Sequence, residues 1–302
     1  MTKQRHDVTR REFLLASAAA GLASFRGLRA ADRAWGVQLY TVRSILPSDP
    51  AGVLRKIAEI GYREVELVRA GMKDVVPHLA AVSLKPAAGH YEAALVTGDW
   101  KASDEAREKD PYLPRDWREA VDVAAKVGLE FMVISSFRAP RDAGLDAYRR
   151  FAEQMNRAAE VCSQAGLRLA YHNHAFEFDP AKGERPIDIF LEEFGPDVTI
   201  ELDVFWASVA GEDPTTLIRT WGKRVSLLHL KDRKPGVSPT FVEFQVPRDA
   251  FREVGQGVLD FPGILAAAER TGVSHYFVEQ DQCPGNPLDS IKKSFEYLKQ
   301  LS

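Results

Sequence analysis

The sequence predicts one domain folded as a closed barrel of eight parallel strands, each followed by a helix, which is a (β/α)8 or TIM barrel. Beyond residue 30, short apolar runs of strand length alternate with longer amphipathic runs of helix length. Eight such pairs fit into about 270 residues, close to the ~250 usual for this barrel. Alternating strands and helices imply parallel strands with right-handed crossovers. We disfavour an open doubly wound sheet because no Gly-x-Gly-x-x-Gly pattern follows the first strand.

The composition provides a large core and an acidic body. The 302 residues are 45% hydrophobic and 27% charged, which suits one large domain over 31–302. The formal net charge is −3, and setting aside residues 1–30 leaves 34 basic and 41 acidic residues, a charge of −7. An acidic body argues against nucleic acid as a partner. Two cysteines, Cys162 and Cys283, allow at most one disulfide.

Residues 1–30 are expected to be a Tat-type signal peptide rather than part of the fold. Arg10 and Arg11 form a twin-arginine pattern, an apolar stretch follows from 13 to 22, and small residues surround Ala30. The stretch is too short for a permanent transmembrane helix, so we expect no stable membrane insertion. The Tat translocase is therefore an expected partner and the periplasm, or another exported location, the expected destination. The alternative is a basic leader without a targeting role.

Capping residues mark the expected helix boundaries. The pairs Asp49-Pro50 and Asp213-Pro214 each open a helix, because aspartate is a good N-cap and proline fits the first turn. Gly61 and Gly128 end helices, and Pro77 is expected to interrupt one. The expected helices are 50–60, 73–82, 111–128, 145–165, 187–194, one from 214, 262–271, and a last helix with Ile291, Phe295 and Leu298 on one face.

The eight expected strands end in polar residues at several places. They are 35–43 with its exit loop, 64–68, 84–91, 131–134, 167–172, 198–203, 225–230 and 276–279. Asp203 ends the sixth strand, His229 lies near the end of the seventh, and Glu279 ends the eighth. Polar groups at the exit of a buried strand are costly unless paired or put to use. Every barrel strand delivers its carboxyl end to the same mouth, so we expect these side chains to converge.

The converging side chains predict a site for one divalent metal ion. Asp203, His229 and Glu279 supply three ligands, and a fourth should come from the fifth strand. The candidates there are His172, His174 and Glu177. An Asp/Glu/His mixture suits Mn²⁺, Mg²⁺, Co²⁺ or Zn²⁺. Such an ion can hold two neighbouring oxygens of a keto-sugar and stabilise an enediolate.

Other residues are expected to shape the pocket and to act on the substrate. Lys231 and Asp232 follow His229 closely and either act on substrate or bond each other. Trp206 can stack on a sugar face or pack at the rim. Glu201 lies two residues before Asp203, so both point inward if either does. We assign substrate binding to His90, His172, His174 and Trp206, and catalysis to Glu177, Glu279 and Lys231.

Six stretches resemble the sugar phosphate isomerase/epimerase family of xylose-isomerase-like barrels. They are 36–43, 171–177, 202–206, 228–232, 253–261 and 278–282, which sample the whole chain after the leader. The family pattern of Glu, Asp, His and Glu implies Glu177, Asp203, His229 and Glu279 as ligands of one ion, Mn²⁺ above all. Some relatives carry the first glutamate inside the strand, where this chain has Tyr171 and His172.

These features predict a metal-dependent isomerase or epimerase acting on a keto-sugar. One carboxylate, Glu177 or Glu279, removes a proton beside the carbonyl, and the other or a histidine returns it. The alternative is an exported lyase, dehydratase or glycoside-cleaving enzyme that eliminates from a 3-keto sugar with the same metal. An endonuclease is disfavoured by the acidic body, and an exported sugar-binding protein is the non-enzymatic alternative. A homo-oligomer is compatible with the sequence.

Overall fold

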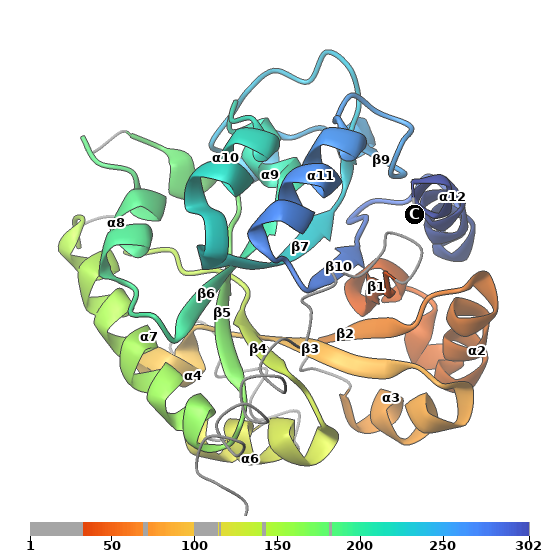
Figure 1. The fold of residues 1–302 in the computed structure, drawn as a ribbon, viewed down its shortest axis with the longest axis horizontal. Helices are drawn as coiled ribbons and strands as arrows, with labels where there is room; N and C mark the ends of the chain where they lie inside the picture. Colours follow the sequence, from red (N-terminus) through yellow and green to blue (C-terminus); the bar gives the residue numbers. More distant parts are fainter. Residues whose placement is uncertain are drawn as a thin grey trace, which may run out of the picture. The chain divides into compact units, whose positions relative to one another are not determined.

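Eight parallel strands close into a barrel, with helices packed round its outside (Figure 1). The computed structural model describes residues 33–68, 72–99, 114, 116–140, 143–180 and 183–301. The expected leader, residues 1–30, lies outside the described residues. Within the described part, no helix is both long and apolar enough to cross a bilayer. The order round the barrel is β1-β10-β7-β6-β5-β4-β3-β2, as a TIM barrel requires.

The barrel strands confirm the predicted alternation, and four of them match the predicted bounds. The strands are β1 Trp35–Gln38, β2 Glu64–Val68, β3 Lys85–Tyr91, β4 Phe131–Ile134, β5 Arg168–His172, β6 Val198–Asp203, β7 Val225–Leu230 and β10 His275–Val278. Every neighbouring pair is parallel. Strands buried on both faces read as continuous apolar runs of strand length, which explains the agreement.

Several helices begin or end at the caps expected from the sequence, and others differ from the expected bounds by a few residues. They are α2 Pro50–Ile60, α3 Met72–Leu79, α4 Ala94–Thr97, α6 Trp117–Val127, α7 Asp146–Gln164, α8 Pro186–Glu193, α9 Val204–Val209, α10 Pro214–Trp221, α11 Phe261–Thr271 and α12 Pro287–Gln300. The Asp49 carboxylate accepts from the Gly52 amide, and Asp213 caps α10 in the same way. Gly61 and Gly128 terminate α2 and α6 with positive φ.

Several local features differ from the prediction. Pro77 lies inside α3, which continues for two residues beyond it, so the expected interruption is not observed. The connection after β7 contains a small antiparallel pair, β8 Asp232–Arg233 and β9 Phe251–Arg252. Two-residue strands carry no readable periodicity, and neither do the short helices α4 and α9. Cys162 and Cys283 are both free thiols.

The barrel interior has an apolar plug beneath a polar mouth. Side chains on each strand alternate between the interior and the helix-facing side. The plug is formed by Ala87, Ala88, Phe131, Val133, Ala170, Leu227 and Phe277. Phe277 lies against Gly36, where a Cβ atom would overlap its ring. Two residues further along β5 and β7, the same face carries His172 and His229 instead of apolar side chains.

Asp232 ties the long connection after β7 to the barrel. Its buried carboxylate accepts hydrogen bonds from the amides of Arg233, Gly255, Gly257 and Leu259, at 2.7–3.1 Å. A carboxylate that accepts several amide hydrogen bonds fixes the backbone around it. Of the two alternatives for Lys231 and Asp232, a bond between them is not observed, since Asp232 holds the loop and Lys231 pairs with Asp203, Glu279 and Asp281.

We expect Asp232→Ala to destabilise the protein by roughly 2–4 kcal/mol, because four amides lose their acceptor. Urea denaturation followed by fluorescence measures the effect. The matched control is Asp249→Ala in the same connection, where the carboxylate is exposed and pairs with Lys234. The control should leave the midpoint almost unchanged. Equal midpoints for the two variants would contradict this role of Asp232.

Candidate active site

Four side chains meet at the carboxyl ends of neighbouring strands. His172 ends β5, Asp203 ends β6, His229 is the fifth residue of β7, and Glu279 directly follows β10. All four are buried, and one ligand atom from each lies within 4.8 Å of the others. The His172 Nε2 atom lies 3.3 Å from Asp203 Oδ2, and His229 Nδ1 lies 2.9 Å from Glu279 Oε2. We call these four residues the upper group.

The upper group fits a divalent cation. It offers two imidazole nitrogens and two carboxylates, which suit a hard or borderline ion such as Mn²⁺, Co²⁺ or Zn²⁺. The buried His229 Nδ1 atom faces the carboxylates of Glu279 and Asp203, at 2.9 Å and 3.6 Å. The Lys231 ammonium lies 3.0 Å from Asp203 Oδ2 and 2.6 Å from Glu279 Oε2. An ion in this group would therefore share both carboxylates with Lys231.

Attraction between the buried carboxylates of the upper group and nearby cationic side chains favours the ionised form of these carboxylates. Burial alone would raise the pKa of Asp203, but Lys231 and His172 hold that pKa well below its usual value. The pKa of Glu279 is lowered against the same burial, chiefly by Lys231 and then His229. Burial opposes the charged form of Lys231, yet Asp203, Asp281 and Glu279 raise its pKa well above the ordinary value. The carboxylates are thus ready to bind a cation.

Glu177, the expected fourth ligand, does not belong to the upper group. It lies on the short 3-10 helix Phe176–Phe178, where its carboxylate accepts from the Tyr171 hydroxyl at 2.7 Å and the His174 amide at 2.8 Å. Burial raises its pKa to about 8, against the effect of these hydrogen bonds. The structure brings His172 to the place expected for Glu177. The sequence pattern that could have identified His172 is the alternation along β5. His172 lies two residues after Ala170 and therefore on the same inward face.

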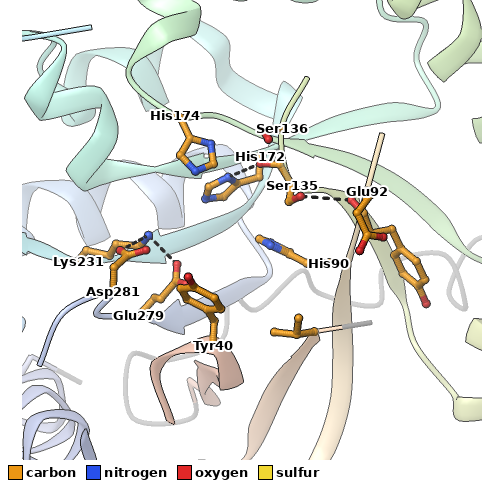
Figure 2. A pocket seen from close by; sticks show the side chains of 12 residues that line it. Tyr40, His90, Glu92, Ser135, Ser136, His172, His174, Lys231, Glu279 and Asp281 are labelled. Carbon is orange, nitrogen blue, oxygen red and sulfur yellow. Dashed lines mark hydrogen bonds and ion pairs between the residues drawn. The ribbon is translucent and has the colours of Figure 1, made fainter. Parts of the chain in front are cut away.

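A cavity of about 310 Å³ opens above the upper group (Figure 2). It is lined by Tyr40, Val68, His90, Tyr91, Glu92, Ser135, Ser136, His172, His174, Lys231, Glu279 and Asp281. The structure thus brings together five of the residues predicted to bind or act on substrate. Trp206 and Glu177 do not line this cavity. Trp206 is buried against Phe205 and Phe251, with its ring 5.4 Å from that of His174.

The sequence reasoning missed Asp281, Ser135, Ser136 and Glu92. Asp281 accepts from Lys231 at 2.9 Å, two residues beyond Glu279. Glu92 and Ser135 each directly follow a barrel strand, β3 and β4, and Ser136 comes next. Position immediately after a barrel strand was therefore the signal that could have found them.

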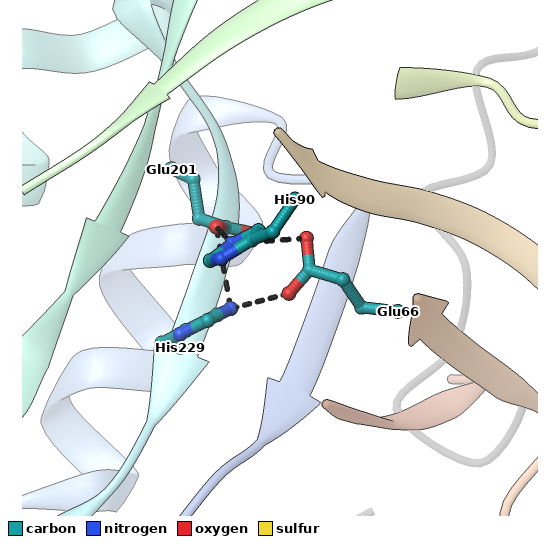
Figure 3. Close-up of side chains that lie close together, drawn as sticks. All are labelled: Glu66, His90, Glu201 and His229. Carbon is teal, nitrogen blue, oxygen red and sulfur yellow. Dashed lines mark hydrogen bonds and ion pairs between the residues drawn. The ribbon is translucent and has the colours of Figure 1, made fainter. Parts of the chain in front are cut away.

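A second group of polar side chains lies beside the first and shares His229. It consists of Glu66 from β2, His90 from β3, Glu201 from β6 and His229 (Figure 3). The His229 Nε2 atom lies 2.5 Å from Glu66 Oε2 and 3.2 Å from Glu201 Oε2. We call these four residues the lower group, because Glu201 precedes Asp203 by two residues on one strand. The two nitrogens of His229 therefore face different groups.

A closed parallel barrel with charged groups at its carboxyl mouth defines a TIM-barrel enzyme. Residues 54–301 match the family described as "Xylose isomerase-like TIM barrel", so the chain belongs to that family. The resemblance seen in the sequence is confirmed at the level of the family and the fold.

Named relatives cover most of the chain. Inosose dehydratase of Geobacillus kaustophilus is 26% identical over 273 residues, covering 82% of this chain and 86% of that protein. A sugar phosphate isomerase/epimerase from Parabacteroides distasonis superposes with a TM-score of 0.70 at 26% identity, covering 92% and 95% of the two chains. IOLI protein with a bound zinc atom superposes with a TM-score of 0.61 at 16% identity, covering 89% and 94%, which shows the fold alone.

We expect His172→Ala to weaken metal binding by more than the roughly 10–100-fold seen for residues that only orient a ligand. Glu177→Gln should keep the ion, because Glu177 lies outside the upper group. The measurement is metal content after gel filtration of protein reconstituted with Mn²⁺ or Zn²⁺, together with a chelator competition. Loss of the ion in Glu177→Gln but not in His172→Ala would restore Glu177 as the ligand.

Glu177 also predicts a pH dependence of stability. Its folded-state pKa of about 8 exceeds the ~4.3 of an unfolded glutamate. The contribution is therefore fully present below pH ~4 and is lost as the pH rises through 8. Between pH 5 and 8, unfolding free energy should fall more steeply for the wild type than for Glu177→Gln, by up to about 1.4 kcal/mol per pH unit. Parallel curves from denaturant titrations would refute this.

Proposed function

We propose that the protein is a metal-dependent enzyme that removes the proton beside the carbonyl of a keto-sugar or a related polyhydroxylated ketone. The observation that carries this proposal is the buried upper group, His172, Asp203, His229 and Glu279, at the base of the cavity. A divalent ion held by these four side chains would supply the Lewis acidity that stabilises negative charge on substrate oxygens.

Glu279 is the base in this proposal. It lines the cavity, and its lowered pKa keeps it in the ionised form. Lys231 donates to its Oε2 atom at 2.6 Å and to Asp281 at 2.9 Å, so the carboxylate has a fixed orientation. A positioned carboxylate within reach of an acidic C–H bond is the usual arrangement for general base catalysis. Lys231 additionally stabilises charge that develops on the substrate.

His174 is assigned to hydrogen-bond the substrate in this proposal. Burial lowers its pKa well below the ordinary value, and His172 and Lys231 add to the lowering, so the ring is neutral. Its Nδ1 atom is buried with no hydrogen-bond partner among the described residues, and the residue lines the cavity. A neutral imidazole donates a hydrogen bond through one nitrogen and accepts one through the other. His90 and His172, also in the cavity lining, are assigned to hold substrate hydroxyls.

Two fates of the deprotonated substrate are supported by different relatives. Loss of a β-hydroxyl group gives a lyase, which is the reaction class in the name inosose dehydratase; this relative and the present chain overlap over most of their lengths. Return of the proton gives an isomerase or epimerase, as named for the structure from Parabacteroides distasonis. We favour elimination, in which the proton that Glu279 takes from the carbon passes to the leaving oxygen, and retain isomerisation as the second candidate.

We expect metal-loaded protein to exchange solvent deuterium into the carbon beside the carbonyl of keto-sugars and inososes. Elimination lowers the product mass by one water molecule, whereas isomerisation leaves it unchanged, so mass spectrometry separates the two fates. Glu279→Gln should reduce turnover by at least about 100-fold, the lower range for a general base. His78→Ala, on the outer helix α3, is the matched control and should retain full turnover. Undiminished exchange in Glu279→Gln would exclude Glu279 as the base.

A further inference from the structure

We propose that the lower group, Glu66, His90, Glu201 and His229, is a second divalent-cation site that shares His229 with the upper group. This inference goes beyond the proposed function, because it concerns ion binding and holds for either fate of the substrate. It is carried by the geometry of the four side chains and by unpaired oxygens among them.

The four ligand atoms are spaced as they would be round one small ion. The His90 Nε2 atom lies 2.8 Å from Glu201 Oε2 and 3.4 Å from Glu66 Oε1. The His229 Nε2 atom lies 2.5 Å and 3.2 Å from the same two carboxylates. A tetrahedral ion with ligands at 2.0–2.2 Å separates them from one another by about 3.4 Å. Small outward shifts would therefore make room for an ion.

Two fully buried carboxylates in this group each keep an unpaired oxygen. Glu66 Oε1 and Glu201 Oε1 have no hydrogen-bond partner within the described part of the chain. The ion-pair partners of both residues there are the imidazoles of His90 and His229. Gln38 adds one neutral donor to Glu66 Oε2 at 2.8 Å. Burying two carboxylates beside imidazole partners alone is costly, and a divalent cation would offset both charges.

Both imidazoles direct their Nε2 atoms at the carboxylates of the lower group. The rings of His90 and His229 are stacked, with centroids 5.2 Å apart and planes within 9° (Figure 3). Both use Nε2 toward the carboxylates, which leaves His229 Nδ1 for Asp203 and Glu279. An ion on each side would make His229 a bridge, and the ring would release its remaining N–H proton to solvent. His90 lines the cavity, so ions can reach this group from the barrel mouth.

The alternative for the lower group is purely structural. Glu66 and Glu201 could serve as acceptors that hold the Nε2–H of His229, so that Nδ1 faces an ion in the upper group. This alternative predicts one ion per chain. The proposed bridge predicts two.

The experiment counts Co²⁺ and Zn²⁺ ions per chain. Chelator-treated full-length protein is titrated with either ion, exchanged into metal-free buffer, and measured by elemental analysis and native mass spectrometry. We expect two ions in the wild type and one in Glu66→Gln, in His90→Ala and in His172→Ala. The matched control is Glu64→Gln, two residues earlier on β2, where the carboxylate bonds to His275 at the opposite end of the barrel. It should retain two ions.

Magnetic coupling between two bound Co²⁺ ions tests whether they share a ligand, which counting the ions does not. Two Co²⁺ ions bridged by one imidazole should give a weaker electron paramagnetic resonance signal per ion than the single Co²⁺ left in His90→Ala. Glu66→Gln keeps the volume of the side chain, so it tests the site even if His90→Ala fails to fold.

The outcomes separate this inference from the proposed function. One ion in the wild type that persists in His90→Ala and Glu66→Gln but is lost in His172→Ala would overturn the second site and leave the upper group standing. One ion that is lost in His90→Ala and kept in His172→Ala would instead overturn the upper group and the proposed function, and would support the lower site.

Discussion

Closure of the parallel barrel is the constraint on which the candidate site depends. Strands that close on themselves direct alternate side chains into one narrow interior, and their carboxyl ends meet at one mouth. Residues as distant in sequence as Glu66 and His229 therefore come within 2.5 Å. The apolar plug below, formed around Phe131 and Phe277, leaves these polar groups only the mouth as an opening. The same closure explains why the site is buried and yet accessible.

The carboxylates of the upper and lower groups have different cationic partners. The upper group carries carboxylates that Lys231 neutralises, whereas the lower group balances Glu66 and Glu201 with imidazoles alone. Burial raises the pKa of Glu66 to about 7, with the neighbouring Glu201 adding to the effect. The histidines lower the pKa of Glu201 to about 2 against its burial. Such opposed shifts in adjacent groups are typical of functional sites.

The consecutive residues Lys231 and Asp232 have different roles: the first lies in the candidate active site, and the second holds the loop after β7. Lys231 extends toward Asp203, Glu279 and Asp281, whereas Asp232 turns the other way and accepts four amides of the connection after β7. Successive residues of an extended segment point to opposite sides, which allows this division. The anchoring of the loop thereby fixes the backbone from which Lys231 reaches the cavity.

The sequence by itself determined the order and type of the main elements and three side chains of the upper group. Periodicity and caps such as Asp49 and Gly61 are local signals, and Asp203, His229 and Glu279 stand at strand ends that those signals locate. Only the tertiary structure placed His172, and not Glu177, beside the other three side chains. It also buried Trp206 away from the cavity and brought Glu66 close to Glu201. The physical reason is that contacts across a barrel depend on register and closure between distant strands, which no local pattern encodes.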